Sequence, residues 1–351
     1  MEFDLEKLIR ENIKKLTPYS SARSEFKGEA SVFLDANENP FGSPLLTKSF
    51  NRYPDPLQWK VKFELAKIKG VPAENIFIGN GSDEVIDLAN RIFCNPGKDN
   101  VIICPPTYGM YEVSANINDV EIKKVSLNND FQLDVEGILE ATDENTKLLF
   151  ICSPNNPTGN NMNRGDIEIL LNNFPGLIII DEAYINFSRQ KTFIQELTEY
   201  PNLIVMQTLS KAWGMAGLRL GLAFASLDII DLFNKVKPPY NINASSQQLT
   251  LEALKNTGQV NEWIKEIVDQ RNSIKQELSL FSFVEKIYES DANFLLVKVE
   301  DADSLYQYLR NKKIVVRSRS KEVLCENCIR ITIGTMEENK VLLEAFKNYN
   351  S

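Results

Sequence analysis

One lysine stands in a segment whose residue types suit it to hold a phosphorylated aldehyde. Residues 208–221 read TLSKAWGMAGLRLG, in which small residues separate Lys211 from Arg219 and let backbone and ligand approach closely. A lysine amine forms a Schiff base with a carbonyl compound when desolvation or a neighbouring cation lowers its pKa. The hydroxyls of Thr208 and Ser210 and the Arg219 guanidinium are donors that suit a phosphate dianion. A Ser-Lys pair beside glycine is also typical of a solvated loop, so the other motifs must decide.

Polar side chains also follow three other apolar runs, where parallel strands would end. LLFICSPNNPTG leads into a turn that holds Asn156, and LIIIDEAY contains Asp181 and Tyr184. IFIGNGSDE enters a Gly-rich turn before a helix that starts near Ser82 and Asp83, whose free backbone N–H groups form an anion site. Ligands bind beyond the carboxyl ends of the strands in open α/β sheets. The strand ends therefore predict one shared site, although a lone Asp after a strand is more often a helix cap.

These residue types match the reactive features of pyridoxal 5′-phosphate. Lys211 would take its aldehyde, and Asp181 would hold its ring nitrogen protonated, which makes the ring an electron sink. Asn156 and Tyr184 would hydrogen-bond its phenolic oxygen. The phosphate would be bound by Thr208, Ser210, Arg219 and the backbone at Ser82 and Asp83. Tyr108, in CPPTYGMY, would cover the ring face, unless it is an ordinary surface tyrosine.

Composition argues against several other kinds of protein. The chain has 351 residues, 43% hydrophobic and 25% charged, which favours two globular domains. Its net charge of −9 and the lack of a Lys/Arg-rich run argue against nucleic acid as a partner. The start, MEFDLEKLIR, lacks an apolar signal region, and the longest apolar runs are too short to span a bilayer. We therefore expect a cytoplasmic protein without a membrane partner.

The absence of histidine limits the chemistry further. Without imidazole, the Ser-His-Asp, Cys-His and HExxH systems are excluded, which leaves lysine, carboxylate and tyrosine to move protons. The five cysteines are an odd number in a long chain, so a disulfide framework is not expected. Cys325 and Cys328 form a CxxC that could be half of a zinc site or a redox pair. No second CxxC completes a tetrahedral set, so we expect no metal.

Hydrophobic periodicity predicts an α/β fold with a mostly parallel sheet covered by helices. A helix over 5–16 is followed by an irregular arm through DANENPFG and RYPDP. Helices are then expected at 57–69, 82–94, 107–117 and 164–173, and strands at 76–79, 101–104, 121–125, 147–152, 177–181, 203–208 and 220–225.

The last part of the chain reads as a smaller α+β unit. A long helical region over 244–280 precedes it, and its elements are expected as strands near 293–298, 314–317 and 329–333 and helices near 302–311 and 336–349. We therefore predict an N-terminal helix and arm over 1–43 that joins the small domain, a large cofactor-binding domain over 44–280, and a small domain over 281–351.

The motifs resemble those of pyridoxal-phosphate enzymes of the aspartate-aminotransferase fold, also called fold type I. Within that fold the chain is most similar to the histidinol-phosphate aminotransferase family. The similarity covers nearly the whole length, from LTPYSSAR, LDANENPFG and RYPDP through CSPNNPTG and DEAYINF to IVVRS and CIRITIGT. It implies transamination between histidinol phosphate and 2-oxoglutarate, giving imidazole-acetol phosphate and glutamate. It also implies a homodimer with shared active sites, in which Tyr53 reaches the cofactor phosphate of the partner subunit.

The resemblance further implies a substrate site made by Tyr19, Asn37, Arg317 and Arg330. Arg330 would bind the carboxylate of glutamate in one half-reaction and the phosphate of histidinol phosphate in the other. A single arginine in a small α+β domain is usually a surface charge, but Arg330 lies in a half-buried strand pattern, where an unpaired guanidinium is costly. The same fold leaves two other activities open, an aromatic amino-acid aminotransferase and a threonine-phosphate decarboxylase. A non-catalytic effector-binding domain is a further alternative, and no helix-turn-helix segment or basic face supports it.

Overall fold

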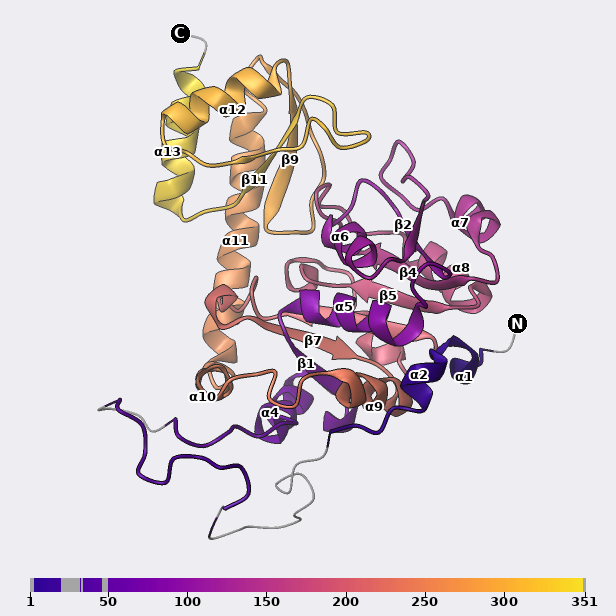
Figure 1. The fold of residues 1–351 in the computed structure, drawn as a ribbon. Helices are drawn as coiled ribbons and strands as arrows, with labels where there is room; N and C mark the ends of the chain where they lie inside the picture. The colour runs from indigo at the N-terminus through magenta and orange to yellow at the C-terminus, as the bar shows by residue number, and fades with distance from the viewer. Residues whose placement is uncertain (1–2, 20–31, 33, 46–49, 350–351) are drawn as a thin grey trace.

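The computed structural model describes residues 3–19, 32, 34–45 and 50–349, and Figure 1 shows how the chain is arranged. Within these residues, the larger sheet has seven strands in the order β1-β7-β6-β5-β4-β2-β3. They are β1 (Ile76–Asn80), β2 (Asn100–Ile103), β3 (Glu121–Lys124), β4 (Thr146–Cys152), β5 (Leu177–Asp181), β6 (Leu203–Thr208) and β7 (Leu220–Phe224). Neighbouring strands are parallel except where β7 meets β1 and β6. The predicted α/β fold with a mostly parallel sheet is confirmed.

Helices cover both faces of this sheet because its central strands carry apolar side chains on both sides. In β5, Ile178 and Ile180 belong to one buried cluster, whereas Leu177 and Ile179 belong to the other. The helices over the first cluster are α4 (Trp59–Lys69), α7 (Val135–Ala141) and α8 (Arg164–Asn173). Those over the second are α5 (Ser82–Phe93), α6 (Met110–Ile117) and α9 (Leu227–Val236). The alternation of side chains along the strands thus divides the core into two layers.

A smaller antiparallel sheet follows later in the chain, in the order β10-β11-β9-β8. Its strands are β8 (Val284–Ile287), β9 (Phe294–Val299), β10 (Arg317–Ser318) and β11 (Cys328–Thr332), and its helices are α12 (Ala302–Asn311) and α13 (Met336–Lys347). Helix α11 (Thr257–Leu278) extends from the larger sheet to the smaller one in Figure 1, and its Ile267 packs against both cores. The expected domain boundary near residue 280 follows this helix directly and stays a prediction, since α11 packs on both sides.

The predicted helix over 5–16 is wrong in its continuity. It forms two single turns, α1 (Leu5–Leu8) and α2 (Glu11–Lys14), because Ile9 and Arg10 are extended. The interruption lets both Leu8 and Ile9 pack in the core of the larger sheet, and not on the small domain as the sequence predicted for this helix. It also lets Arg10 donate from its backbone nitrogen to the Ile92 carbonyl at 3.1 Å, at the end of α5. Tertiary contacts therefore outweigh the helical periodicity of this segment.

Other elements also differ from the prediction. The region 244–280 is divided into α10 (Ala244–Ala253) and α11, and β10 is only two residues long. Helices α7 and α9 and strand β8 have no counterpart in the prediction. Short 3₁₀ turns are η1 (Ala73–Asn75), η2 (Ile185–Phe187), η3 (Phe193–Glu196) and η4 (Ala216–Leu218). In the part of the chain that the structure describes, each helix is too short or too polar to cross a membrane.

Candidate active site

A cavity of about 390 Å³ lies beyond the carboxyl ends of β4, β5 and β6 and extends to β10 and β11 of the smaller sheet. Residues from both sheets line it: Ser82, Asp83, Tyr108, Cys152, Asn156, Asp181, Ala183, Tyr184, Thr208, Ser210, Lys211, Arg219, Arg317, Arg319 and Arg330. The fold thus gathers the residues predicted for the site, except Tyr19, Asn37 and Tyr53, in one place. Arg319 is a lining residue that the sequence reasoning missed.

Lys211 is presented by the turn that follows β6. The Thr208 hydroxyl accepts a hydrogen bond from the Ser210 backbone nitrogen at 3.0 Å and donates to the Leu220 carbonyl at 3.3 Å, which fixes the turn against β7. The Lys211 ammonium lies 5.6 Å from the centre of the Tyr184 ring. The loss of surrounding water and then the charge of Arg330 lower the pKa of Lys211, whereas Asp181 acts in the opposite direction. The site therefore increases the fraction of free amine at a given pH.

Asp181 is the last residue of β5, and its carboxyl group is buried among a few donors. The Tyr111 hydroxyl donates to it at 2.7 Å, and the Ala183 backbone nitrogen donates at 3.0 Å. Burial raises the pKa of Asp181, and the bond from Tyr111 acts against that shift. Tyr111 was missed in the sequence, where it reads as an ordinary core residue of α6. Its spacing of three from Tyr108, in the same CPPTYGMY motif, was the available signal.

The N-terminus of α5 forms one end of the cavity. Gly81 precedes the helix with a φ of 81°, and a Cβ there would lie 2.7 Å from the Arg219 guanidinium. A Cβ on Gly221 of β7 would lie 2.1 Å from the Ser82 backbone nitrogen, so the strand passes directly beside the first helical turn. Arg219 pairs with Asp83 at 3.6 Å. A helix N-terminus beside a guanidinium and the Ser210 hydroxyl suits a phosphate group.

The small residues after Lys211 border open space in the described chain. Apart from the chain neighbours of each glycine, no atom of the described residues lies within 4 Å of a Cβ built on Gly214 or Gly217. Their predicted role in letting a ligand approach stays a prediction, whereas Gly81 and Gly221 allow a close approach within the protein, beside the helix N-terminus. Gly214 is required for its backbone, which has a φ of 65°.

Arginines from the smaller sheet form the opposite end of the cavity. Arg317 and Arg330 are register partners across β10 and β11, so their side chains share one face of the sheet. Arg330 donates to the Asn156 amide oxygen, and its guanidinium lies 5.2 Å from the centre of the Phe294 ring. Burial and then the charges of Arg319 and Arg317 lower the pKa of Arg330. Such a cluster of cations favours an anionic ligand.

Asn155 lies beside Asn156 but is fully buried and does not line the cavity. Its amide nitrogen donates to the Pro106 carbonyl at 2.9 Å and to the Thr158 hydroxyl at 2.7 Å. Its amide oxygen accepts from the Thr107 hydroxyl at 3.2 Å. Asn155 therefore ties the loop that carries Tyr108 to the loop that carries Asn156.

The donors of this cavity fit pyridoxal 5′-phosphate. The buried Asp181 carboxyl suits a protonated ring nitrogen, and Lys211 faces the same space with a lowered pKa. The helix N-terminus and Arg219 suit the phosphate, and Tyr108 is available for the ring face. The cavity volume is within the usual range for small-molecule sites.

The family model for aminotransferase class I and II matches residues 31–346. The chain belongs to this family. It is 55% identical over 345 residues to a histidinol-phosphate aminotransferase of Parabacteroides distasonis, covering 98% of this chain and 99% of that protein. It is also 54% identical over 349 residues to a histidinol-phosphate aminotransferase of Cytophaga hutchinsonii, covering 99% of this chain and 100% of that protein.

Solved aminotransferase structures have the same fold. The histidinol-phosphate aminotransferase of Clostridium acetobutylicum aligns with a TM-score of 0.78 and 26% identity, covering 85% of this chain and 90% of that one. The α/β fold that the strand and helix pattern predicted is therefore the fold of an aminotransferase.

In this aminotransferase, three residues predicted for the site lie outside the cavity of the single chain. Tyr53 stacks on Tyr240 with ring centres 4.5 Å apart, and Tyr53 and Asn37 line a separate cavity of about 550 Å³. Tyr53 is 51% exposed and Tyr19 is 73% exposed. Their roles stay predictions, and the role of Tyr53 concerns a second copy of the chain.

The cysteines of the aminotransferase are all free and buried. Burial raises the pKa of Cys325 to about 12 and that of Cys328 to about 11, so both are thiols at neutral pH. A neutral buried thiol is a poor nucleophile.

Proposed function

We propose that the chain transfers an amino group between histidinol phosphate and 2-oxoglutarate, giving imidazole-acetol phosphate and glutamate, with pyridoxal 5′-phosphate as its cofactor. The observation that carries the proposal is the lining of the cavity, which brings Lys211 and Asp181 together with an arginine cluster from the smaller sheet. Relatives that are 54–55% identical over almost the full length and named for this reaction support it.

The cofactor, when bound, supplies an electron sink for the bond that breaks at the substrate α-carbon. Lys211 has two tasks, which are to hold the cofactor and to move a proton at the α-carbon. Both tasks need the unprotonated amine, which the lowered pKa of Lys211 favours. Asp181, oriented by Tyr111, keeps a proton on the cofactor ring nitrogen.

The arginine end binds the acidic groups of the substrates. A guanidinium offers two parallel N–H donors, so Arg330 can hold either a carboxylate or a phosphate. Its bond to Asn156 fixes it next to the residue proposed for the phenolic oxygen. One site can therefore serve both a dicarboxylate and a phosphate ester.

We also propose that the enzyme is a homodimer in which Tyr53 reaches the cofactor phosphate of the partner and Tyr19 and Asn37 help to close the site. Support comes from the exposure of Tyr53 and Tyr19 in the single chain. A cytoplasmic location is proposed as well, since buried free thiols suit a reducing compartment. The division into an arm (1–43), a large domain (44–280) and a small domain (281–351) belongs to the same proposal.

The dimer can be tested by complementation. A Tyr53→Ala chain and a Lys211→Ala chain, each inactive alone, should recover part of the activity after subunit exchange. One site of the mixed dimer then holds both intact residues. Proven exchange without recovery would exclude the shared site.

The function is tested by adding glutamate and then imidazole-acetol phosphate to the purified holoenzyme. The absorbance of the lysine-bound cofactor should fall with glutamate and return with imidazole-acetol phosphate. Phenylalanine and threonine phosphate serve as controls for the two activities that the sequence left open. Faster turnover of phenylalanine, or release of CO₂ from threonine phosphate, would contradict the proposal.

A further inference from the structure

Arg319 adds a third guanidinium to the arginine end of the cavity. It follows Arg317 by two residues in an extended segment, so both side chains are directed to the same side. The Arg319 backbone nitrogen donates to the Cys328 carbonyl at 2.8 Å, which continues the hairpin beyond β10. Arg317, Arg319 and Arg330 therefore converge from the two strands of one hairpin.

The contacts of Arg319 leave part of its guanidinium for a ligand. Nη1 pairs with the Glu322 carboxylate at 2.9 Å, and the side chain is 16% exposed. Nε is buried without a hydrogen-bond partner among the described residues. Nε and Nη2 form the edge of the fork opposite Nη1, which is a bidentate donor for an oxyanion.

The charge at this end also selects between anions. The guanidinium groups of Arg317, Arg319 and Arg330, together with the Glu322 carboxylate that pairs with Arg319, carry a net charge of +2 (3 − 1 = 2). A phosphate monoester carries about −1.5 to −2 at neutral pH. A single carboxylate carries −1. The Arg319–Glu322 pair adds no net charge, so Arg319 favours a phosphate by adding a third guanidinium donor for its three oxygens, whereas a carboxylate has only two oxygens.

We propose that Arg319 is a specificity-determining residue, which strengthens binding of a substrate phosphate through its Nε–Nη2 edge and has little effect on a substrate carboxylate. This inference rests on the proposed function, since it concerns how the same cavity separates its two substrates. Glu322 accepts a hydrogen bond from Arg319 Nη1 and moderates its charge, and Glu322→Gln would keep an acceptor oxygen while removing the negative charge. Arg330 remains the donor that both substrates share.

The test compares equilibrium binding of inorganic phosphate and of succinate to the holoenzyme by calorimetry. Succinate is a dicarboxylate of similar size to glutamate that carries no amino group. Arg319→Gln should weaken phosphate binding by about 10- to 100-fold, because a charged hydrogen bond is lost. Succinate binding should change by less than about threefold. Arg319→Lys, which keeps the charge but loses the fork, should be intermediate for phosphate.

Glu322→Gln separates this role from a structural one. The charge argument expects phosphate binding to be equal or tighter, because a nearby carboxylate is removed. If the Arg319–Glu322 pair only holds the loop, both variants should weaken both ligands and lower the melting temperature together. Arg310→Gln, on the exposed side of α12, is the matched control for loss of one arginine.

The inference is overturned if Arg319→Gln leaves phosphate binding unchanged, weakens phosphate and succinate equally, or is mimicked by Glu322→Gln. Its failure is distinct from failure of the proposed function. Normal transamination of histidinol phosphate with no effect of Arg319 would reject the inference alone. Arg319-dependent phosphate binding without that transamination would reject the function alone.

Discussion

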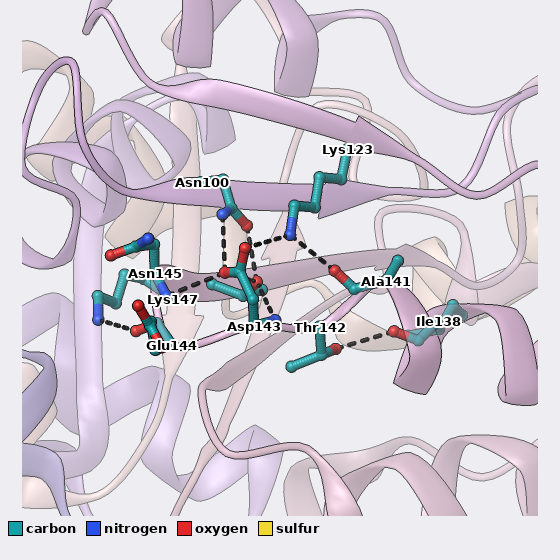
Figure 2. Close-up of polar contacts among 10 residues, drawn as sticks. Asn100, Lys123, Ile138, Ala141, Thr142, Asp143, Glu144, Asn145 and Lys147 are labelled. Carbon is teal, nitrogen blue, oxygen red and sulfur yellow. Dashed lines mark hydrogen bonds and ion pairs between the residues drawn. The ribbon is translucent and has the colours of Figure 1, made fainter.

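Two aspartates lie at opposite ends of strand β4 and have opposite electrostatic surroundings. Asp143 precedes the strand, at the amino edge of the sheet, and four groups donate to it (Figure 2). They are the Lys123 ammonium at 2.6 Å, the Asn145 backbone nitrogen at 2.9 Å, and the Asn100 amide and Thr146 hydroxyl at 3.0 Å. These donors, Lys123 first, hold the pKa of Asp143 well below its usual range.

Asp181 lies next to the other end of β4, where it is the register partner of Cys152. It is 4% exposed and accepts hydrogen bonds from Tyr111 and from the Ala183 backbone. Burial raises its pKa. An aspartate at the amino edge of the sheet thus accepts hydrogen bonds from four groups, whereas the aspartate at the carboxyl edge accepts from only two among the described residues.

The difference teaches how a structural carboxylate is distinguished from a functional one. The carboxylate of Asp143 already accepts hydrogen bonds from four groups of the protein, so a ligand would add little stabilisation. Asp181 keeps an unmet demand for a positive partner, which a protonated ring nitrogen satisfies. Perturbed groups that gather in one cavity, with a reason for each shift, indicate a reaction site.

The largest expected effect is that of Lys211→Ala. Turnover should fall by more than about 10⁴-fold, because both the covalent anchor and the proton carrier are lost. The protein should still fold and can retain cofactor noncovalently. Borohydride reduction followed by peptide mass mapping identifies the attached lysine. Labelling of Lys69 instead, a half-buried lysine whose pKa desolvation lowers to about 8, would contradict the assignment.

Asp181→Asn should slow turnover by on the order of 10²–10⁴-fold while the cofactor stays bound. A neutral amide cannot keep the ring nitrogen protonated. The matched variant at the amino edge, Asp143→Asn, should leave kcat unchanged. Single-turnover rates with glutamate measure both effects. Near-normal turnover of Asp181→Asn would show that Asp181 has a structural role, as Asp143 does, and no role in catalysis.

Tyr111→Phe should cause a smaller loss, about tenfold, because it removes one charge-assisted hydrogen bond. That bond lowers the pKa of Asp181, so its removal raises this pKa further. The acid limb of the pH–rate profile should therefore move to higher pH. A loss of activity that is equal at every pH would indicate that Tyr111 acts only through packing.

The smallest expected effect is that of Asp143→Asn on the stability of the folded protein. Since the pKa of Asp143 is depressed in the folded state, its contribution is present above the unfolded pKa of about 4 and is lost as pH falls through the folded value. Asp143→Asn should lower the melting temperature slightly near pH 7, and the difference should shrink in acid. A double-mutant cycle with Lys123→Met checks the cause, because the two effects should be less than additive.

Much of the site could be predicted because its residues follow strands in short motifs. Lys211, Asp181 and Asn156 each stand just after a continuous apolar run, and the carboxyl ends of parallel strands meet at one edge. The extent of helices was predicted less well. The periodicity over 5–16 and 244–280 is helical, yet contacts of Arg10 with α5 and the turn near Asn256 interrupt it.

The sequence by itself determined the fold class, the absence of imidazole chemistry and the identities of the groups that would meet the cofactor, since these depend on residue type and local spacing. Tertiary structure decided what neighbours those groups have. Tyr111 and Arg319 read as a core tyrosine and a surface arginine until the fold places them beside Asp181 and Arg330. The direction of the pKa shifts was also decided there, because desolvation and neighbours distant in sequence lower the pKa of Lys211 and raise that of Asp181.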